Sequence, residues 1–147
     1  MGAHLVKLKK WWVETAWFAL VTVVITWPTV LQPGTFALGS PKADGMKHLW
    51  TLWWMRASVW REGSFPFNTQ LVNFPEGMDL YPIEPLNGLI AIGLPFIDII
   101  LLSNLLVMVT LFATGMVGCW FGRLLTEGNR LAGLASGTVL LTGSVTT

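Results

Sequence analysis

Segment 32–85 holds most of the side chains in this 147-residue chain whose chemistry could serve catalysis. Five of the eight carboxylates lie in it, at Asp44, Glu62, Glu76, Asp79 and Glu84. A positioned carboxylate can act as a general base, or it can bind a metal ion that steadies a phosphate leaving group. Asp44 is the candidate for either role, because a predicted helix follows it directly and would fix its position.

Asp44 also suits a structural role. An aspartate before Gly45 and Met46 is a good N-cap, because its carboxylate accepts hydrogen bonds from the free backbone N–H groups of the first helical turn. A capping geometry is compatible with catalysis, so both roles stay open. We therefore predict Asp44 as a catalytic residue that could also ligate a metal ion.

Four further residues could contact a substrate. Glu76 and Asp79 could gather near Asp44, together with Glu84, to hold a cation or a substrate, and the alternative for these acids is a solvated acidic face. Lys47 and His48 could offer positive charge to a phosphate group, and the alternative for them is the polar face of a helix. The predicted substrate-binding set is Lys47, His48, Glu76 and Asp79.

Residues 45–61 are predicted to form an amphipathic helix. At 100° per residue one arc is apolar and carries Met46, Leu49, Trp50, Trp53, Ala57 and Trp60. The opposite side carries Lys47, His48, Thr51 and Ser58. Such a helix suits the plane of the membrane interface, with its aromatic face toward the lipid. The rest of the segment is rich in proline, which predicts an ordered, non-helical return across the surface.

The composition indicates a membrane protein. Of the residues, 53% are hydrophobic and 12% are charged, which is about half the charged fraction of a typical soluble domain. A formal net charge of +1 is far from the dense basic patch that a nucleic-acid partner would require. The single cysteine, Cys119, excludes a disulfide framework or a thiolate metal cage within one chain.

Residues 11–31 are predicted to form the first transmembrane helix, with tryptophans at both ends for the two interfacial belts. Three lysines within residues 1–10 indicate a cytoplasmic N-terminus, so segment 32–85 is expected on the outer face. A removable signal sequence is the alternative, but no small-residue cleavage site follows the apolar run. Glu14, the one charge in this crossing, lies a turn from its N-terminal end, from which its carboxylate could reach the headgroups.

The second apolar stretch, residues 86–125, is too long for one unkinked crossing. Residues 86–100 are therefore predicted to be re-entrant or interfacial, and residues 101–125 to form the second transmembrane helix. This arrangement puts Arg123 and Arg130 on the cytoplasmic side. A tight hairpin that crosses twice is the alternative, and it would put both arginines outside.

A third transmembrane helix is predicted to begin in residues 131–147 and to be cut before the far interface. Gly133, Ser136 and Gly137 would permit close helix packing. The simplest explanation is the N-terminal part of a longer polytopic protein, or a truncated reading frame. The predicted fold class is an all-α integral membrane protein with a long ordered extracytoplasmic loop, which contains an amphipathic interfacial helix.

Four short motifs follow one another along the chain: DGMKHLWTLWW at 44–54, PFNT at 66–69, FPEG at 74–77 and PLNGLIA at 85–91. The motifs of soluble catalytic sites, such as G-x-S-x-G and H-E-x-x-H, are absent. With a basic N-terminus, one crossing and an early loop aspartate, the ordered set resembles the N-terminal module of the GT-C glycosyltransferases. It is similar in particular to large bacterial polytopic members of that superfamily, over residues 10–143.

The resemblance implies an enzyme of the bacterial inner membrane that takes a sugar from a polyprenyl-phosphate carrier and passes it to an acceptor on the outer face. In that family the first outer loop supplies an acidic residue to the active site, and Asp44 stands in the matching place. Asp44 would activate the acceptor as a base, or would ligate a divalent metal ion in members that use one. Many members carry a paired acidic motif, whereas Gly45 follows Asp44 here. A complete active site is not expected in this chain alone.

Two other functions stay open. A non-catalytic multi-pass membrane protein could act as a scaffold or subunit, with the tryptophan-rich helix as an interfacial anchor. Its third helix would pack on a partner subunit or on the remainder of a longer chain. A channel or transporter segment is less favoured, because the crossings hold no buried charge apart from Glu14 and Asp98 near the interfaces.

Overall fold

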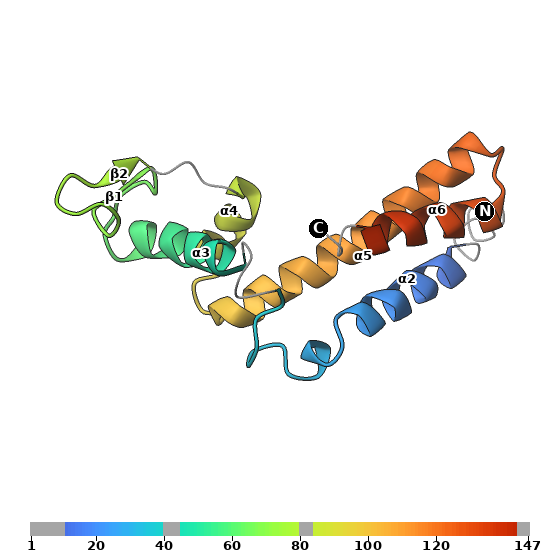
Figure 1. Ribbon diagram of the computed structural model, residues 1–147, viewed down its shortest axis with the longest axis horizontal. Helices are drawn as coiled ribbons and strands as arrows, with labels where there is room; N and C mark the ends of the chain where they lie inside the picture. Colours follow the sequence, from blue (N-terminus) through green and yellow to red (C-terminus); the bar gives the residue numbers. More distant parts are fainter. Residues whose placement is uncertain (1–10, 40–44, 80–83, 144–147) are drawn as a thin grey trace, which may run out of the picture. The chain divides into compact units, whose positions relative to one another are not determined.

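The computed structural model describes residues 11–39, 45–79 and 84–143. Of these residues 67% are helical, which confirms the predicted all-α class at a coarse level. Figure 1 shows the five α-helices of the described residues: α2 (Trp12–Ile25), α3 (Gly45–Trp60), α4 (Pro85–Gly93), α5 (Ile99–Leu125) and α6 (Arg130–Gly143). The same residues contain a short 3-10 helix, η1 (Thr29–Leu31), and an antiparallel pair of two-residue strands, β1 (Asn68–Thr69) and β2 (Met78–Asp79).

The chain divides into two compact units. The first, here called the helical unit, is made of residues 1–30 and 107–147 and contains α2, α6 and most of α5. The second, here called the loop unit, is made of residues 31–106 and contains α3, α4, the β1–β2 hairpin and the first turns of α5. Segment 32–85 therefore folds together with α4 rather than as a separate connection.

Helix α5 is 27 residues long and apolar enough to span a membrane, and no other helix of the described residues meets both conditions. At about 1.5 Å per residue it is about 40 Å long, against a hydrocarbon core of about 30 Å. It begins at Ile99, two residues before the predicted start. Asp98 sets this start, because its Oδ1 accepts hydrogen bonds from the N–H groups of Ile100 and Leu101 at 2.8 and 3.2 Å.

Helix α2 has 14 residues, fewer than the predicted span over residues 11–31. It ends at Ile25, after which the Thr26 hydroxyl donates to the carbonyl oxygen of Thr22 at 2.8 Å. Pro28 has no N–H group and restricts the residue before it, so the α-helix stops and η1 follows. The predicted continuous helix over residues 11–31 is therefore wrong in its extent, since a spanning helix needs roughly 17 residues or more.

Glycines let α5 and α6 approach closely in the helical unit. A Cβ atom on Gly137 would lie 2.3 Å from the carbonyl oxygen of Gly115 and 2.5 Å from Phe18. A Cβ atom on Gly133 would lie 2.9 Å from the carbonyl oxygen of Cys119. Phe18 and Cys119 are fully buried beside this contact. The predicted close packing at Gly133 and Gly137 is therefore confirmed. The glycines of α5 against which they pack were not predicted.

The loop unit is built around α3 and α4. Leu52 of α3, Ala91 of α4 and Leu102 of α5 form its buried apolar cluster. Gly88 permits the close approach of the two helices, because a Cβ atom there would overlap the side chain of Met55. The position of α4 against α3 thus depends on side chains that no motif of the sequence singles out.

Asn104 connects the first turns of α5 to the segment that follows η1. It is fully buried, and its Nδ2 donates to the carbonyl oxygens of Pro33 and Phe36 at 2.6 Å each. Its Oδ1 accepts a hydrogen bond from the N–H group of Leu38 at 2.8 Å. One amide side chain therefore satisfies three backbone groups of a non-helical segment.

The buried face of α3 differs from the predicted one. Thr51 and Ser58, predicted on the polar side, are 7% and 0% exposed, whereas Met46 and Trp60, predicted on the lipid-facing arc, are 60% and 61% exposed. Thr51 and Ser58 can be buried because their hydroxyls donate to carbonyl oxygens of the same helix, at 2.8 and 3.1 Å. The predicted polar side is wrong for Thr51 and Ser58, because helical periodicity does not reveal which hydroxyls satisfy themselves. The exposure of Met46 and Trp60 is what a lipid-facing arc requires.

Candidate functional site

His48 and Glu84 meet at one end of the α3–α4 pair. His48 Nδ1 lies 3.1 Å from Glu84 Oε2, and Asn87 Nδ2 donates a hydrogen bond to the same oxygen. The His48 side chain is largely buried, while that of Glu84 is 41% exposed. His48 belongs to the first turn of α3, and Glu84 is the N-cap residue of α4. The contact therefore joins the beginnings of the two helices.

The two helices run in the same direction. At the end opposite to the His48–Glu84 contact, Arg56 Nη1 donates to the carbonyl oxygen of Ile97 at 2.6 Å, and Trp60 Nε1 donates to that of Ile92 at 2.8 Å. A helix N-terminus carries unpaired N–H groups and a partial positive charge. Two such ends side by side favour an anion, and phosphate is the anion that helix N-termini commonly bind in proteins.

The Glu84 carboxylate orients the imidazole of His48. When Nδ1–H donates to a carboxylate, Nε2 is left as an acceptor that can take a proton or a hydrogen bond from a substrate. His48 Nε2 is buried and has no hydrogen-bond partner among the described residues. Nε2 is therefore a nitrogen without a partner in the described part of the chain and without solvent contact, so a phosphate oxygen reaches it only if the surrounding side chains move.

The predicted residues Asp44, Lys47 and His48 follow one another in and just before the first turn of α3. Asp44 lies outside the described residues, and in the chain it directly precedes Gly45, with which α3 begins. Lys47 is exposed and belongs to the same turn as His48. Of the predicted substrate-binding set, His48 contacts Glu84.

Glu76 and Asp79 lie in the β1–β2 hairpin. Asp79 Oδ1 accepts a hydrogen bond from Asn68 Nδ2 at 3.0 Å, and Glu76 is exposed in the turn between the strands. In residues 11–39, 45–79 and 84–143 no three His, Cys, Asp or Glu side chains come close enough together to hold a metal ion. The structure thus gives Glu76 and Asp79 no shared contact with His48.

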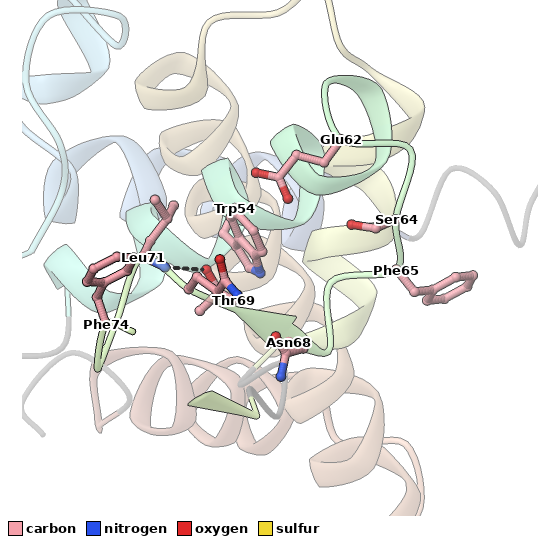
Figure 2. A pocket seen from close by; sticks show the side chains of 9 residues that line it. Trp54, Glu62, Ser64, Phe65, Asn68, Thr69, Leu71 and Phe74 are labelled. Atoms are coloured by element: carbon pink, nitrogen blue, oxygen red, sulfur yellow. Dashed lines mark hydrogen bonds between the residues drawn. The ribbon is translucent and has the colours of Figure 1, made fainter. Parts of the chain in front are cut away.

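A cavity of about 610 Å³ lies between the end of α3 and the hairpin. Figure 2 shows the Trp54 ring near its centre, the Glu62 carboxylate turned toward that ring, and the Phe65 ring turned away. The cavity is lined by Trp54, Glu62, Ser64, Phe65, Asn68, Thr69, Gln70, Leu71 and Phe74. Its volume is within the range of small-molecule sites, about 300 to 1,000 Å³.

Glu14 lies in a buried cluster of charges in the helical unit. Its side chain is fully buried and accepts hydrogen bonds from Arg130 Nε at 2.8 Å, Arg130 Nη2 at 3.2 Å and Arg123 Nη1 at 3.2 Å. The guanidinium of Arg123 also stacks over the Trp11 ring at 4.6 Å from its centroid. The expectation that the Glu14 carboxylate reaches the headgroups is therefore wrong, because the two arginines satisfy it within the protein.

Asn87 and Glu62 are site residues that were not predicted from the sequence. Glu84 and Asn87 are three residues apart across Pro85, and that spacing at a proline-initiated helix was an available signal for a shared contact. Glu62 follows α3 by two residues and carries no spacing signal at all. Its place in the cavity depends on the return of the hairpin, which only the structure shows.

No protein-family model, no curated protein and no solved structure shows significant similarity to this chain.

Proposed function

We propose that this chain is the N-terminal part of an integral membrane glycosyltransferase, which moves a sugar from a polyprenyl-phosphate carrier to an acceptor at the outer face. Three features support the proposal: the resemblance of the ordered motifs, the membrane-spanning length of α5, and the folded loop unit. The N-terminus is cytoplasmic in this proposal and the loop unit extracytoplasmic, in a bacterial inner membrane.

The observation that carries the proposal is the His48–Glu84 contact at the joined beginnings of α3 and α4. Transfer from a polyprenyl phosphate releases a phosphate group, on which negative charge develops as the bond to the sugar breaks. Two helix N-termini and a histidine that can be protonated stabilise such a charge. Asp44, one residue before α3, is in the chain position from which a base or a metal ligand could serve the same reaction.

The division of roles follows from this arrangement. Asp44 removes the proton from the acceptor hydroxyl as the hydroxyl attacks the sugar and the phosphate leaves. If the enzyme uses a divalent cation, Asp44 would be one of its ligands, and the cation would supply positive charge for the phosphate group. His48 and Lys47 contact the phosphate group, and Glu84 with Asn87 keeps the imidazole in place. Glu76 and Asp79 stay candidates for substrate contact from the hairpin. The rest of the active site would come from further helices of a longer chain or from a partner subunit.

The test is sugar transfer from a radiolabelled polyprenyl-phosphate donor in membranes that contain the full-length gene product. We expect Asp44→Asn to lower turnover by about 10² to 10⁴, the usual effect of removing a general acid or base. We expect His48→Gln to lower kcat more than it raises the KM for the donor, because the charge on the phosphate develops as the bond breaks. Arg61→Gln, an exposed change in the same unit, is the matched control. Unchanged turnover with Asp44→Asn would remove Asp44 from the mechanism.

A non-catalytic scaffold is the second candidate, and a groove in the helical unit favours it. This groove, of about 350 Å³, is lined mainly by apolar groups of Trp17, Leu134, Ala135, Thr138 and Val139, and could receive a helix of a partner. In a scaffold Asp44 would act as a cap alone. Asp44→Asn or Asp44→Ala would then change the free energy of unfolding by about 0.5 to 2 kcal/mol at most, with no transfer activity to lose.

A further inference from the structure

The cavity beside the hairpin has no part in the roles given above, and its walls have an unusual composition. One side chain is a carboxylate, four others carry a hydroxyl or an amide, and the remainder are aromatic or aliphatic. No lysine, arginine or histidine lines it. A ligand that fits must therefore offer both hydrogen-bonding groups and apolar surface, and it must carry no negative charge.

The polar groups of the cavity have hydrogen-bonding capacity to spare. The Glu62 carboxylate makes no hydrogen bond or ion pair with any described residue, and Figure 2 shows it turned into the cavity. Asn68 donates from Nδ2 to Asp79, which leaves its amide oxygen as an acceptor. The Thr69 hydroxyl accepts from the N–H group of Leu71 at 3.1 Å and can still donate. The cavity thus contains hydrogen-bond acceptors and a hydrogen-bond donor.

The apolar wall is fixed in place. Trp54 is 2% exposed, its Nε1 donates to the carbonyl oxygen of Pro66 at 3.4 Å, and its ring stacks on Trp50 with 6.2 Å between centroids. Phe74, across the cavity, is 80% exposed. The buried Trp54 ring closes the floor of the cavity, and the exposed Phe74 ring offers a flat surface to the C–H groups of a ligand.

The hairpin that carries the polar wall is held in one geometry. Asn73 and Gly77 close its turn through a backbone hydrogen bond of 2.9 Å and a contact from Asn73 Nδ2 to the Gly77 carbonyl oxygen at 3.3 Å. Gly77 has a φ of +77°, and a Cβ atom there would lie 2.9 Å from the carbonyl oxygen of Thr69. A preformed wall loses little entropy when a ligand binds.

We propose that this cavity binds a neutral saccharide. Sugar rings combine hydroxyl groups at their edges with C–H surfaces on their faces, which matches a carboxylate and amides beside aromatic side chains. An acyl chain would displace water from the Glu62 carboxylate and the amides, which are exposed in the free protein, without offering them hydrogen bonds. A phosphate or another anion would be repelled by the carboxylate. In the proposed transferase the saccharide would be the acceptor, and the assignment of that role rests on the proposed function.

The experiment measures binding directly and without a donor. The 147-residue chain in lipid nanodiscs is titrated with lactose, maltose and α-1,2-mannobiose, and saturation-transfer NMR reports the bound sugar. Sorbitol and tetramethylammonium chloride test an open-chain polyol and an organic cation in the same way. We expect at least one disaccharide to bind, and we expect neither sorbitol nor tetramethylammonium to displace it.

Two matched pairs of variants locate the binding. Glu62→Gln should weaken it about tenfold by removing a charged hydrogen-bond partner, and Arg61→Gln, which removes a charge next to the cavity, should leave it unchanged. Phe74→Ala should weaken it, whereas Phe96→Ala, at a side chain with the same 80% to 81% exposure outside the cavity, should not.

Three results would overturn the inference: no disaccharide binds, all four variants bind alike, or tetramethylammonium binds in place of sugar. Asp44→Asn separates this inference from the proposed function. Saccharide binding by this chain, without any transfer activity of the full-length gene product, would leave the cavity assigned and the transferase wrong. Transfer that depends on Asp44 but not on Glu62 or Phe74 would support the transferase and show that its acceptor does not bind in this cavity.

Discussion

Glu14 is the residue whose surroundings depart most from those of a simple apolar helix. Its carboxylate is fully buried between two arginines from the last turn of α5 and the first turn of α6, so the cluster carries one net positive charge. Buried ion pairs of this kind give little net stability over an apolar replacement, but removing one partner is costly. The cluster thus fixes how α2 meets the turn between α5 and α6.

We predict that Glu14→Gln lowers the free energy of unfolding by about 2 kcal/mol. The amide would leave two guanidinium groups facing each other without a counter-charge, and the value is below that of a fully buried pair because Arg130 is 46% exposed. Reversible unfolding in detergent micelles measures the change. Glu127→Gln, an exposed change in the connecting turn, should have no effect, and an equal loss in both variants would contradict the role of the buried cluster.

The contact between α5 and α6 depends on glycines rather than on interdigitating large side chains. Gly118 approaches Gly137 so closely that a Cβ atom on it would lie 2.9 Å from the Gly137 Cα. Small residues of this kind let two helix backbones pack against each other where no water drives association. The helix pair therefore tolerates very little added volume at these positions.

We predict that Gly137→Ala destabilises the helical unit by about 1 to 3 kcal/mol, because the new methyl group overlaps the Gly115 carbonyl oxygen and Phe18. Gly143→Ala is the control in the same helix, since a Cβ atom there meets nothing within 4 Å. It should be neutral or slightly stabilising through higher helix propensity. Thermal unfolding of the two variants side by side measures the difference, and equal melting temperatures would count against the close contact.

The existence of the helices was predictable, and their faces and partners were not. Helical periodicity located α3, and apolar runs located α5 and the start of α6, to within a few residues, whereas the end of the first helix was predicted at residue 31 and α2 ends at Ile25. Burial of Thr51 and Ser58 was not predictable, because it depends on hydroxyls that bond within their own helix. The contact of His48 with Glu84 joins residues 36 positions apart, and only the parallel packing of α3 on α4 reveals it.

The molecule as a whole combines a helical unit with a loop unit that carries all of the proposed chemistry. Helix α5 begins in the loop unit and continues through the helical unit as one element. The proposed orientation assigns the first turns of α5 to the outer face and Arg123 to the cytoplasmic side. This orientation makes a prediction that does not depend on catalysis.

In a Cys119→Ser background, a cysteine in place of Arg61 should react with a membrane-impermeant maleimide in intact cells. A cysteine in place of Glu127 should react only after the cells are permeabilised, since both positions are exposed and differ in their expected side. Labelling efficiency before and after permeabilisation is the measurement. Reaction of position 127 in intact cells, together with protection of position 61, would show that the topology is the reverse of the proposed one. The proposed transferase site would then lie on the side of the membrane away from its donor.

Asn104 has a consequence for how the protein is made. Its three backbone partners precede it in the chain by 66 to 71 residues, so they leave the ribosome well before it does. An amide within an apolar helix would oppose entry into lipid if it had no partner. Because these carbonyl and N–H groups are already synthesised when Asn104 emerges, insertion of the helix and docking of the preceding segment can occur as one event.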